Sequence, residues 1–446
     1  MVIGPLTWSV LAPLAFGALC LAKDRSARWF ALLGSLVPLA VGLAALGDFA
    51  RHPGSDFRLL ETFPWSVALG ASWTVGVDGI SAAMLALSGL VVAIATISGW
   101  NQQRSPRAYH ALTMLLLAAM NGVFVTLDLL VFYVCWEVML VPMLLLIGLW
   151  GGDQRRYAAM KFFVYTLAGS VLMLAMLIAM WNALPDGQRT FDLRVLTTQW
   201  KLWESTAFLG IPLAAFGFLA VLLAALVKVP AVPLHTWLPH AHVQAPTAIS
   251  VILAGILLKL GVYALYRLAW PLFPAQALHW GWLIGLIGVI GILWGAWVAL
   301  GQRDLKRLVA YSSVSHMGFC LLGLASLSVA GATGGMVQAV THGLSSSLLF
   351  LLVGVIYDRA HHRNVDGFGG LAAPMPRFAW ILLIACLAGA GLPGLAGFPG
   401  EVMALFGSFT AGGYFPWFAV IATLSVILSA AYLLWMLKRV AYGPLL

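Results

Sequence analysis

Four ionisable side chains lie within long apolar stretches of this 446-residue chain, where a charge is energetically expensive. Glu137 lies in FYVCWEVMLVPM, Lys228 ends an apolar run before VPAVPLHTWLPHAH, Lys259 lies in ILAGILLKLGVYALYR, and Glu401 follows GLPGLAGFPG. A buried carboxyl group or amine holds or releases its proton as nearby charges approach or leave. These residue types therefore suggest proton transfer inside a membrane.

Each of these four residues also has a structural alternative. Glu137 and Lys259 could each form a static ion pair or hydrogen bond. Lys228 could extend its amine to the cytoplasmic surface while its stem stays in the membrane. Glu401, judged by spacing alone, could equally be structural.

Histidines extend the set, because neutral imidazole both donates and accepts a proton. His235, His316 and His342 could continue a proton path between the charged residues. Two alternatives use the same side chains. His235, His240 and His242 could bind a metal, although no carboxylate or cysteine lies near them, and His316 with His342 could bind a haem.

The composition places these residues in a membrane protein. Hydrophobic residues make up 62% of the chain and charged residues 9%, and the mean hydropathy is +0.97. The pattern indicates one integral membrane domain over 1–446, with no soluble domain. The first apolar run is too long for a signal peptide and reads as a retained helix. The four cysteines are solitary, so an iron–sulfur or structural zinc site within the chain is disfavoured.

Apolar runs of about 20 residues recur, each long enough to cross a bilayer as a helix. The predicted fold is an all-α polytopic membrane protein with about thirteen spans. The span at 376–408 is too long for one straight crossing, so it should be broken or tilted. The spans are 3–22, 29–48, 77–99, 109–127, 128–150, 156–181, 207–228, 247–270, 279–300, 306–328, 333–357, 376–408 and 414–437.

Two of these spans contain helix-breaking residues next to a charge. Four prolines follow Lys228 in span 7, and a Gly/Pro cluster at 389–400 precedes Glu401 in span 12. Corresponding breaks five spans apart predict two inverted five-helix repeats, a transporter-like architecture with ion sites at membrane depth. The predicted division is 1–105 for helices 1–3, 106–270 for helices 4–8, and 278–440 for helices 9–13.

The distribution of lysine and arginine predicts the orientation. One set of loops holds fifteen of these residues and the other holds five, so the richer set should face the cytoplasm. The N-terminus is then outside and the C-terminus inside. The richer set contains Lys23, Arg25, Arg28, Arg104, Arg107, Arg155, Arg156, Arg303, Lys306, Arg307, Arg359, Arg363, Arg377, Lys438 and Arg439. The net charge of +9 reflects this bias rather than nucleic-acid binding.

Charge separation gives these residues a mechanism. If Glu137 approaches Lys228, the lysine keeps its proton, and if the pair separates, the buried lysine is driven to release it. Moving one charge across 100 mV costs about 2.3 kcal/mol, which is comparable with a shift of about two pKa units. Lys259 and the histidines would extend the path, and Glu401 would exchange protons with solvent at its end.

Four motifs carry a resemblance to a known family. FYVCWEVMLVPMLLLIGLWGG, LVKVPAVPLHTWLPHAHVQAPTAISVILAGILLKLGVYALYR, LKRLVAYSSVSHMGF and GLPGLAGFPGEVMALFGSF resemble the antiporter-like membrane subunits of respiratory complex I, of the subunit M type. The resemblance runs from about residue 70 to the end of the chain. Such subunits have fourteen helices and two inverted five-helix repeats, whereas this chain stops after the thirteenth predicted helix.

The resemblance implies residue roles. Glu137 and Lys228 would form the charged pair of one half-channel, Lys259 the central link, His235 and His342 parts of the polar axis, and Glu401 the residue of the second half. Glutamate at 401 is typical of subunit M, whereas related subunits and Mrp-type cation/proton antiporters usually carry lysine there. Those antiporters and the membrane subunits of hydrogenase-type complexes are the alternatives.

The resemblance also implies the setting of the chain. It would be a proton-translocating subunit of NADH-quinone oxidoreductase in a bacterial inner membrane, without redox chemistry of its own. FMN, iron–sulfur clusters and quinone would belong to partner subunits, so no cofactor or metal is expected in this chain. The partners would be other membrane subunits, especially neighbouring antiporter-like ones, with the lipid bilayer around them.

Overall fold

The computed structural model describes residues 3–22 and 24–444. Lys23, which the orientation count includes, lies outside the described residues. The chain divides into two compact units, one of residues 1–228 and 263–277 and the other of residues 229–262 and 278–446. Each unit has its own helices and its own apolar core.

Ten helices in the described part of the chain are long and apolar enough to cross a membrane. Each coincides with a span predicted from hydropathy, within a few residues at either end. The polytopic helical architecture is therefore confirmed. The ten are Ser26–Arg51, Gly79–Ser98, Pro106–Val125, Leu129–Trp150, Arg155–Ala183, Thr247–Leu272, Pro274–Leu300, Leu305–Ala325, Val329–Ala360 and Phe415–Ala441.

Three shorter apolar helices fall in the remaining predicted spans: α1 (Pro5–Cys20), α10 (Leu213–Lys228) and α18 (Pro376–Gly389). After α18 the chain is non-helical at 390–396, and α19 (Gly397–Thr410) then begins. The long predicted span 376–408 is thus broken rather than tilted. The total of thirteen spans and the inverted repeats stay predictions.

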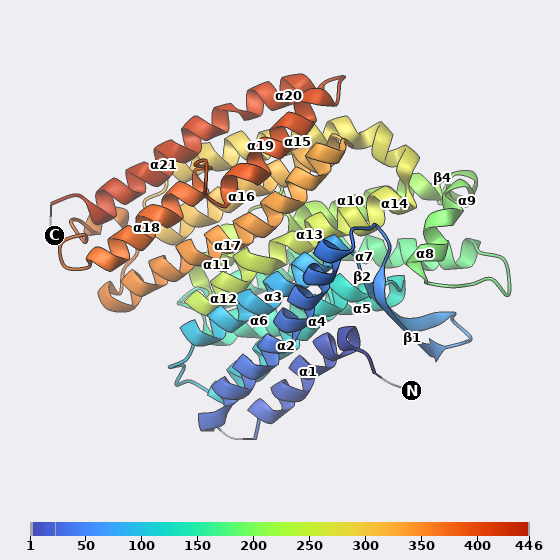
Figure 1. Ribbon diagram of the computed structural model, residues 1–446, viewed down its shortest axis with the longest axis horizontal. Helices are drawn as coiled ribbons and strands as arrows, with labels where there is room; N and C mark the ends of the chain where they lie inside the picture. The colour runs from blue at the N-terminus through green and yellow to red at the C-terminus, as the bar shows by residue number, and fades with distance from the viewer. Residues whose placement is uncertain (1–2, 23, 445–446) are drawn as a thin grey trace. The chain divides into compact units, whose positions relative to one another are not determined.

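The first unit contains most of the N-terminal half of the chain (Figure 1). Helix α2 packs against α1 and α3, and α4 packs against all three of them. Apolar side chains from these helices, such as Leu6 and Leu85, enclose the core of the unit together with the second strand. The further helical elements are α2 (Asp24–Arg51), α3 (Gly79–Ser98), α4 (Pro106–Val125), α5 (Leu129–Val138), α6 (Leu140–Trp150), α7 (Arg155–Ala183), α8 (Leu193–Leu196), η1 (Thr197–Gln199), α9 (Trp200–Ser205), η3 (Leu265–Ala269) and α14 (Trp270–Leu272).

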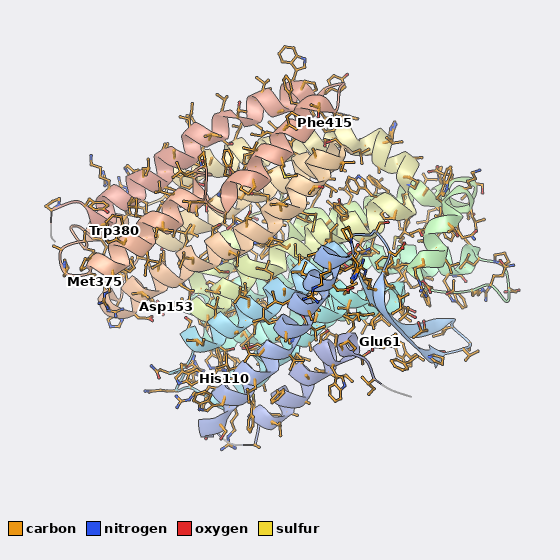
Figure 2. The ribbon with its side chains drawn as sticks, in the orientation of Figure 1. Glu61, His110, Asp153, Met375, Trp380 and Phe415 are labelled. Atoms are coloured by element: carbon orange, nitrogen blue, oxygen red, sulfur yellow. The ribbon has the colours of Figure 1, made fainter. Side chains whose placement is uncertain are left out.

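An antiparallel hairpin of β1 (Arg58–Ser66) and β2 (Ala71–Val77) separates α2 from α3, although the sequence analysis predicted no strand. Glu61 of β1, labelled in Figure 2, accepts hydrogen bonds from the backbone N–H groups of Gly4 at 3.1 Å and Leu6 at 2.9 Å. These are unpaired donors at the start of α1. A strand distant in sequence therefore caps the first helix.

Strands also shorten two predicted spans. The span predicted at 77–99 begins with the last residue of β2, so its helix starts at Gly79. A second small hairpin, β3 (Ala207–Phe208) with β4 (Ile211–Pro212), occupies the start of the span predicted at 207–228. The apolar residues of these strands were included in the predicted membrane spans, because hydropathy does not distinguish a buried strand from the end of a helix.

The second unit is built around α17, which packs along α16 and α19, while α18 packs along α21 (Figure 1). Its core joins side chains of four helices, among them Ile292, Phe319 and Ala404. Two boundaries between the units fall inside helices: one lies within α13 and the other within α15. The elements are α11 (Trp237–Gln244), α12 (Thr247–Ile252), η2 (Leu253–Leu257), α13 (Leu258–Ala264), α15 (Pro274–Leu300), α16 (Leu305–Ala325), α17 (Val329–Ala360), η4 (Val365–Gly367), α20 (Phe415–Ala422) and α21 (Leu424–Ala441).

Each unit contains a helix that starts in the same way. Asp128 caps α5 and forms an isolated antiparallel bridge with Asp192, and Asp304 caps α16 and forms such a bridge with Asn364. In each bridge the second residue, Asp192 or Asn364, accepts a side-chain hydrogen bond from the backbone N–H two residues further along the chain. The two helices are the second members of the predicted repeats, so the shared arrangement supports that prediction.

Candidate proton-transfer sites

Glu137 lies at a helix break in the first unit. It is the penultimate residue of α5, and only Met139 separates this helix from α6. Pro142 has no N–H, so the carbonyl of Val138 loses the partner that residue 142 would supply. The backbone hydrogen bonds on either side of the interruption are long, at 3.4 Å. This third break beside a charged residue was not predicted from the sequence.

Lys228 is the last residue of α10, because Pro230 cannot continue the helix. The side chain is buried, and its Nζ lies 4.7 Å from the ring centroid of Trp136. Within the described residues, neither this amine nor Oε1 of Glu137 has a hydrogen-bond partner. This face of the Lys228 side chain therefore meets an indole ring rather than a hydrogen-bond acceptor.

Glu137 and Lys228 nevertheless lie in the same part of the first unit. The amine of Lys228 lies over the ring of Trp136, the residue that precedes Glu137 on α5. Tyr133, one helical turn before Glu137, interacts with the same carboxylate. The structure thus brings the predicted pair near each other without closing it into a hydrogen-bonded ion pair.

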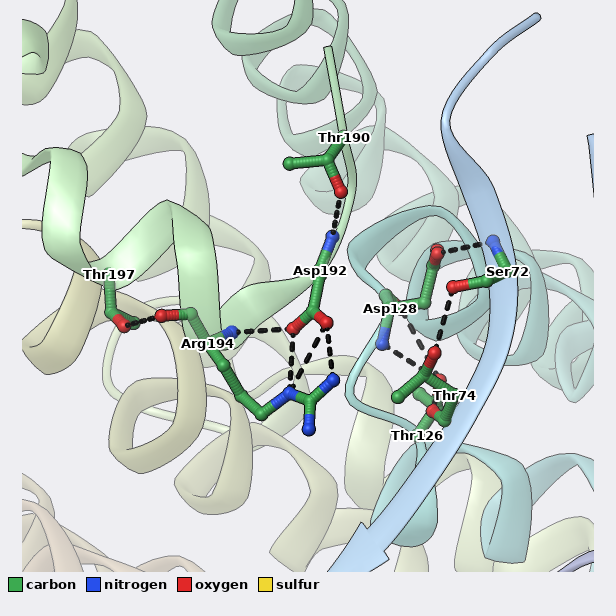
Figure 3. Close-up of polar contacts among 8 residues, drawn as sticks. All are labelled: Ser72, Thr74, Thr126, Asp128, Thr190, Asp192, Arg194 and Thr197. Atoms are coloured by element: carbon green, nitrogen blue, oxygen red, sulfur yellow. Dashed lines mark hydrogen bonds and ion pairs between the residues drawn. The ribbon is translucent and has the colours of Figure 1, made fainter. Parts of the chain in front are cut away.

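Asp128, shown with its contact to Ser72 in Figure 3, fixes the start of the helix that carries Glu137. Its carboxylate accepts hydrogen bonds from the N–H groups of Leu130 at 3.0 Å and Val131 at 3.1 Å, which are open donors of the first turn of α5. It also accepts one from Ser72 of β2 at 2.9 Å. Because Asp128 is fully buried, it caps α5 rather than contacting solvent. The hairpin is therefore tied to the helix of the site.

We expect Asp128→Ala to destabilise the subunit by about 1–2 kcal/mol, because α5 loses its cap. Asp128→Asn keeps the capping oxygen. Burial raises the pKa of Asp128, so the folded state binds this proton more tightly than the unfolded state. The ionised carboxylate therefore costs stability above its folded-state pKa. This cost decreases as the pH falls below that pKa and is gone below the pKa of the unfolded state.

Wild type should accordingly gain stability relative to D128N on acidification. Thermal unfolding of the purified complex between about pH 7 and the ordinary aspartate pKa near 4 measures this difference. Asp304→Asn, at the matching cap of α16, is the control. A stability difference between wild type and D128N that stays constant over this range would contradict the expectation.

In the second unit, Lys259 and His342 are in direct contact. The amine of Lys259 lies 2.8 Å from Nδ1 of His342, and it also donates to the carbonyl of Ala254. That carbonyl belongs to η2, a π-helical segment, and such segments are frequent at functional sites. A charged lysine only donates, so Nδ1 must then accept and Nε2 must carry the imidazole proton. Both side chains are buried.

Glu401 continues this cluster. Its Oε1 lies 3.2 Å from Nδ1 of His316 and accepts a hydrogen bond from Nε2 of Gln338 at 3.3 Å. The rings of His316 and His342 are 5.3 Å apart between centroids. Lys259, His342, His316 and Glu401 therefore form one buried series of proton-binding groups within the second unit. Glu401 is 5% exposed, so the predicted direct exchange with solvent is wrong in this conformation.

Two glycines allow Glu401 to take this position. Gly391, in the break before α19, has φ +70°, and a Cβ there would strike the Glu401 carboxylate. Gly400 brings α19 against α17, since a Cβ would lie 2.6 Å from the backbone N of Gln338. Small residues at helix contacts permit this close packing in membranes. The Gly/Pro cluster thus both breaks the helix and makes room for the carboxylate.

His235 lies in the turn between α10 and α11, where it is buried with its ring 6.0 Å from that of Tyr311. His240 and His242, named above with His235 as possible metal ligands, lie on α11. Cations hold the end of this helix: Lys306 donates to the carbonyl of Ala245 at 2.7 Å, and an arginine donates to a carbonyl two residues earlier.

Some residues in or near these sites were given no role in proton transfer from the sequence. Gln338 was not singled out, although its position four residues before His342 places both on one face of α17. His242 is fully buried and stacked on Phe350, and neither ring nitrogen has a hydrogen-bond partner among the described residues. Trp136, beside Glu137, was quoted but given no role. Nothing in local sequence indicated its approach to Lys228.

The structure bears on the metal and haem alternatives. Nowhere in the described residues do three or more histidine, cysteine, aspartate or glutamate side chains come together as a possible metal site. His316 and His342 face each other directly, and their Nδ1 atoms are engaged by Glu401 and Lys259. In this arrangement both Nδ1 atoms already have protein partners, so neither is free to be an axial ligand of a haem.

These observations define the class of the protein as a polytopic α-helical membrane protein with ionisable side chains buried among its helices. Comparison with known proteins agrees with this membrane-protein class. Residues 126–428 match the family described as NADH:quinone oxidoreductase/Mrp antiporter, TM. The chain is 42% identical over 430 residues to NADH-quinone oxidoreductase subunit M of Rhodobacter capsulatus, covering 95% of this chain and 82% of that relative. It is 40% identical over 442 residues to NAD(P)H-quinone oxidoreductase chain 4 1 of Synechococcus sp. (strain JA-3-3Ab), with coverages of 97% and 82%.

A solved structure gives the same result. A chain of respiratory complex I from Thermus thermophilus with bound NADH superposes with a TM-score of 0.88 at 34% identity, covering 98% of this chain and 89% of that chain. The chain belongs to the NADH:quinone oxidoreductase/Mrp antiporter membrane family.

Proposed function

We propose that this chain is a proton-translocating membrane subunit of an NADH–quinone oxidoreductase, of the subunit M type. The observation that carries the proposal is the buried series Lys259, His342, His316 and Glu401, whose members are in successive contact. Burial of four proton-binding groups in one series is energetically costly and is typical of proton paths in membrane proteins.

Glu137 and Lys228 act as the switch of the first unit. With the pair closed, the carboxylate stabilises the protonated amine. With the pair open, as in this structure, the buried amine loses that partner and proton release becomes more favourable. The break at Met139 and the end of α10 place both side chains beside interrupted backbone, where a small movement changes their separation.

The second unit relays the proton. Lys259 passes a proton to Nδ1 of His342 when its own charge is destabilised, and the resulting imidazolium gives the proton on its Nε2 to the neighbouring imidazole of His316. His316 lies between the ring of His342 and Glu401. Gln338, which contacts both His316 and Glu401, keeps the imidazole and the carboxylate aligned.

The chain itself carries no redox step in this proposal. Electron transfer would occur on cofactors in partner subunits, and its energy would reach this chain through neighbouring membrane subunits. The membrane is the bacterial inner membrane, with the N-terminus outside and the C-terminus inside. The orientation rests on the lysine and arginine bias of the loops.

Co-purification tests the assignment. The tagged chain is extracted from its native host in mild detergent and assayed for NADH-dependent quinone reduction, with an untagged strain as control. We expect the activity to purify with the tag. An intact chain that purifies without dehydrogenase activity, and whose ion transport follows an imposed Na⁺ gradient, would overturn the assignment in favour of a cation/proton antiporter.

Replacements at Glu401 test whether its proton is used. We expect Glu401→Asp to keep more coupled activity than Glu401→Gln, because aspartate still ionises whereas the amide does not. The amide retains the shape needed by Gln338 and His316, so the comparison separates protonation from packing. The measurement is NADH-driven acidification of membrane vesicles at equal complex content. Equal activity of the two variants would argue against a protonatable role.

A further inference from the structure

The Lys228 amine rests on an aromatic ring rather than on an acceptor. Its Nζ is 4.7 Å from the ring centroid of Trp136, and neither side chain is more than 2% exposed. The amine has no hydrogen-bond partner in the described residues. An ammonium group without an acceptor is strongly disfavoured in a dry interior. The face of an indole is the aromatic surface that best compensates such a charge.

The indole is held in place by its own helix. Phe132, one turn earlier on α5, stacks against Trp136 with ring centroids 5.8 Å apart and an interplanar angle of 23°. The start of that helix is fixed by the buried cap at Asp128. The ring therefore presents a preformed surface to Lys228, at little cost in side-chain ordering.

Trp136 and Glu137 are consecutive residues, so their side chains leave the helix about 100° apart. A flexible lysine side chain at the end of α10 can reach either of them by rotating its stem. The structure has the amine on the ring and away from the carboxylate. The ring of Trp136 and the carboxylate of Glu137 are therefore adjacent alternative partners, of different strength, for the ammonium group of Lys228.

We propose that Trp136 is a positioning residue that holds the protonated amine of Lys228 while the pair with Glu137 is open. The inference rests on the proposed function, since it assigns the open state of that switch. The cation–π contact keeps the proton on Lys228 for as long as the pair with Glu137 stays open. Without this contact, opening the pair would release the proton early, and coupling would be lost.

Fluorination of the ring tests this directly. Successive fluorines weaken the electrostatic attraction of the indole face with almost no change of shape, so a residue that only fills space would not respond. Fluorotryptophans are introduced at position 136 by nonsense suppression, and the complex is assembled in native membranes. NADH-driven proton translocation is measured per assembled complex. We expect a stepwise fall with each fluorine, about tenfold in total for the tetrafluorinated ring.

The control is the same series at Trp203. This tryptophan is fully buried, its indole N–H donates to the carbonyl of Leu196, and no cation lies over its ring among the described residues. A flat response is expected there. Two substitutions add a second readout: Trp136→Phe keeps a weaker aromatic face and should retain more coupled activity than Trp136→Leu.

The possible outcomes distinguish failure of the role proposed for Trp136 from failure of the proposed Glu137–Lys228 switch. A flat series at Trp136, in a complex where Glu137→Gln abolishes pumping, overturns the inference and leaves the switch intact. A flat series together with full pumping by Glu137→Gln means that the proposed function itself is wrong for this pair. A graded loss confined to Trp136 supports the inference.

Discussion

Glu137→Gln is expected to remove most NADH-driven proton translocation from the assembled complex. Glutamine has nearly the shape of glutamate but no charge, so it cannot stabilise the ammonium group of Lys228. The loss of even one pKa unit of coupling corresponds to about a tenfold change, and the expected fall in the coupled rate is at least of that order. The measurement is vesicle acidification together with NADH oxidation, normalised to complex content on native gels.

Glu204→Gln is the matched control for this substitution. Glu204 is a partly buried glutamate of the same unit, on α9, and it contacts Gln276 rather than a lysine. The control should pump at the wild-type rate. Normal coupled turnover of an assembled Glu137→Gln complex would rule out the switch.

Lys259→Met is expected to have an equally large effect in the second unit. The substitution keeps a long apolar stem but leaves the Ala254 carbonyl and Nδ1 of His342 without the donor that they share. It also removes the only amine of the Lys259, His342, His316 and Glu401 series. Proton translocation should fall by about tenfold or more, because a missing member interrupts the series.

Lys259→Arg distinguishes proton transfer from charge. Arginine keeps the positive charge but does not release its proton at accessible pH, so the relay should stop in this variant as well. Lys306→Arg is the control, since this buried lysine needs only a cationic donor for its bond to the Ala245 carbonyl. Wild-type pumping by Lys259→Arg would contradict a relay through this residue.

Some features could be predicted from sequence because they depend on local composition. Membrane spans follow from runs of apolar residues that are long enough to cross a bilayer, and the structure places helices at the predicted positions. The break before Glu401 follows from its Gly/Pro cluster, and the end of α10 at Lys228 follows from Pro230. The ionisable residues could be selected because charge in such runs is costly.

Other features were decided only by the tertiary structure, because they join residues that are far apart in the chain. Glu61 caps α1 from a strand that hydropathy did not separate from its surroundings. Gln338 and His316 meet Glu401 only because close packing brings α17 and α16 against α19.

The same holds for the first unit. The approach of Lys228 to Trp136 depends on how α10 and α5 fold together, and no spacing in the sequence encodes it. Sequence by itself therefore determined which segments form apolar helices long enough to cross a membrane, and it singled out the side chains that are expected to carry protons. The partners of those side chains came from long-range packing, which sets the distances over which a proton can move.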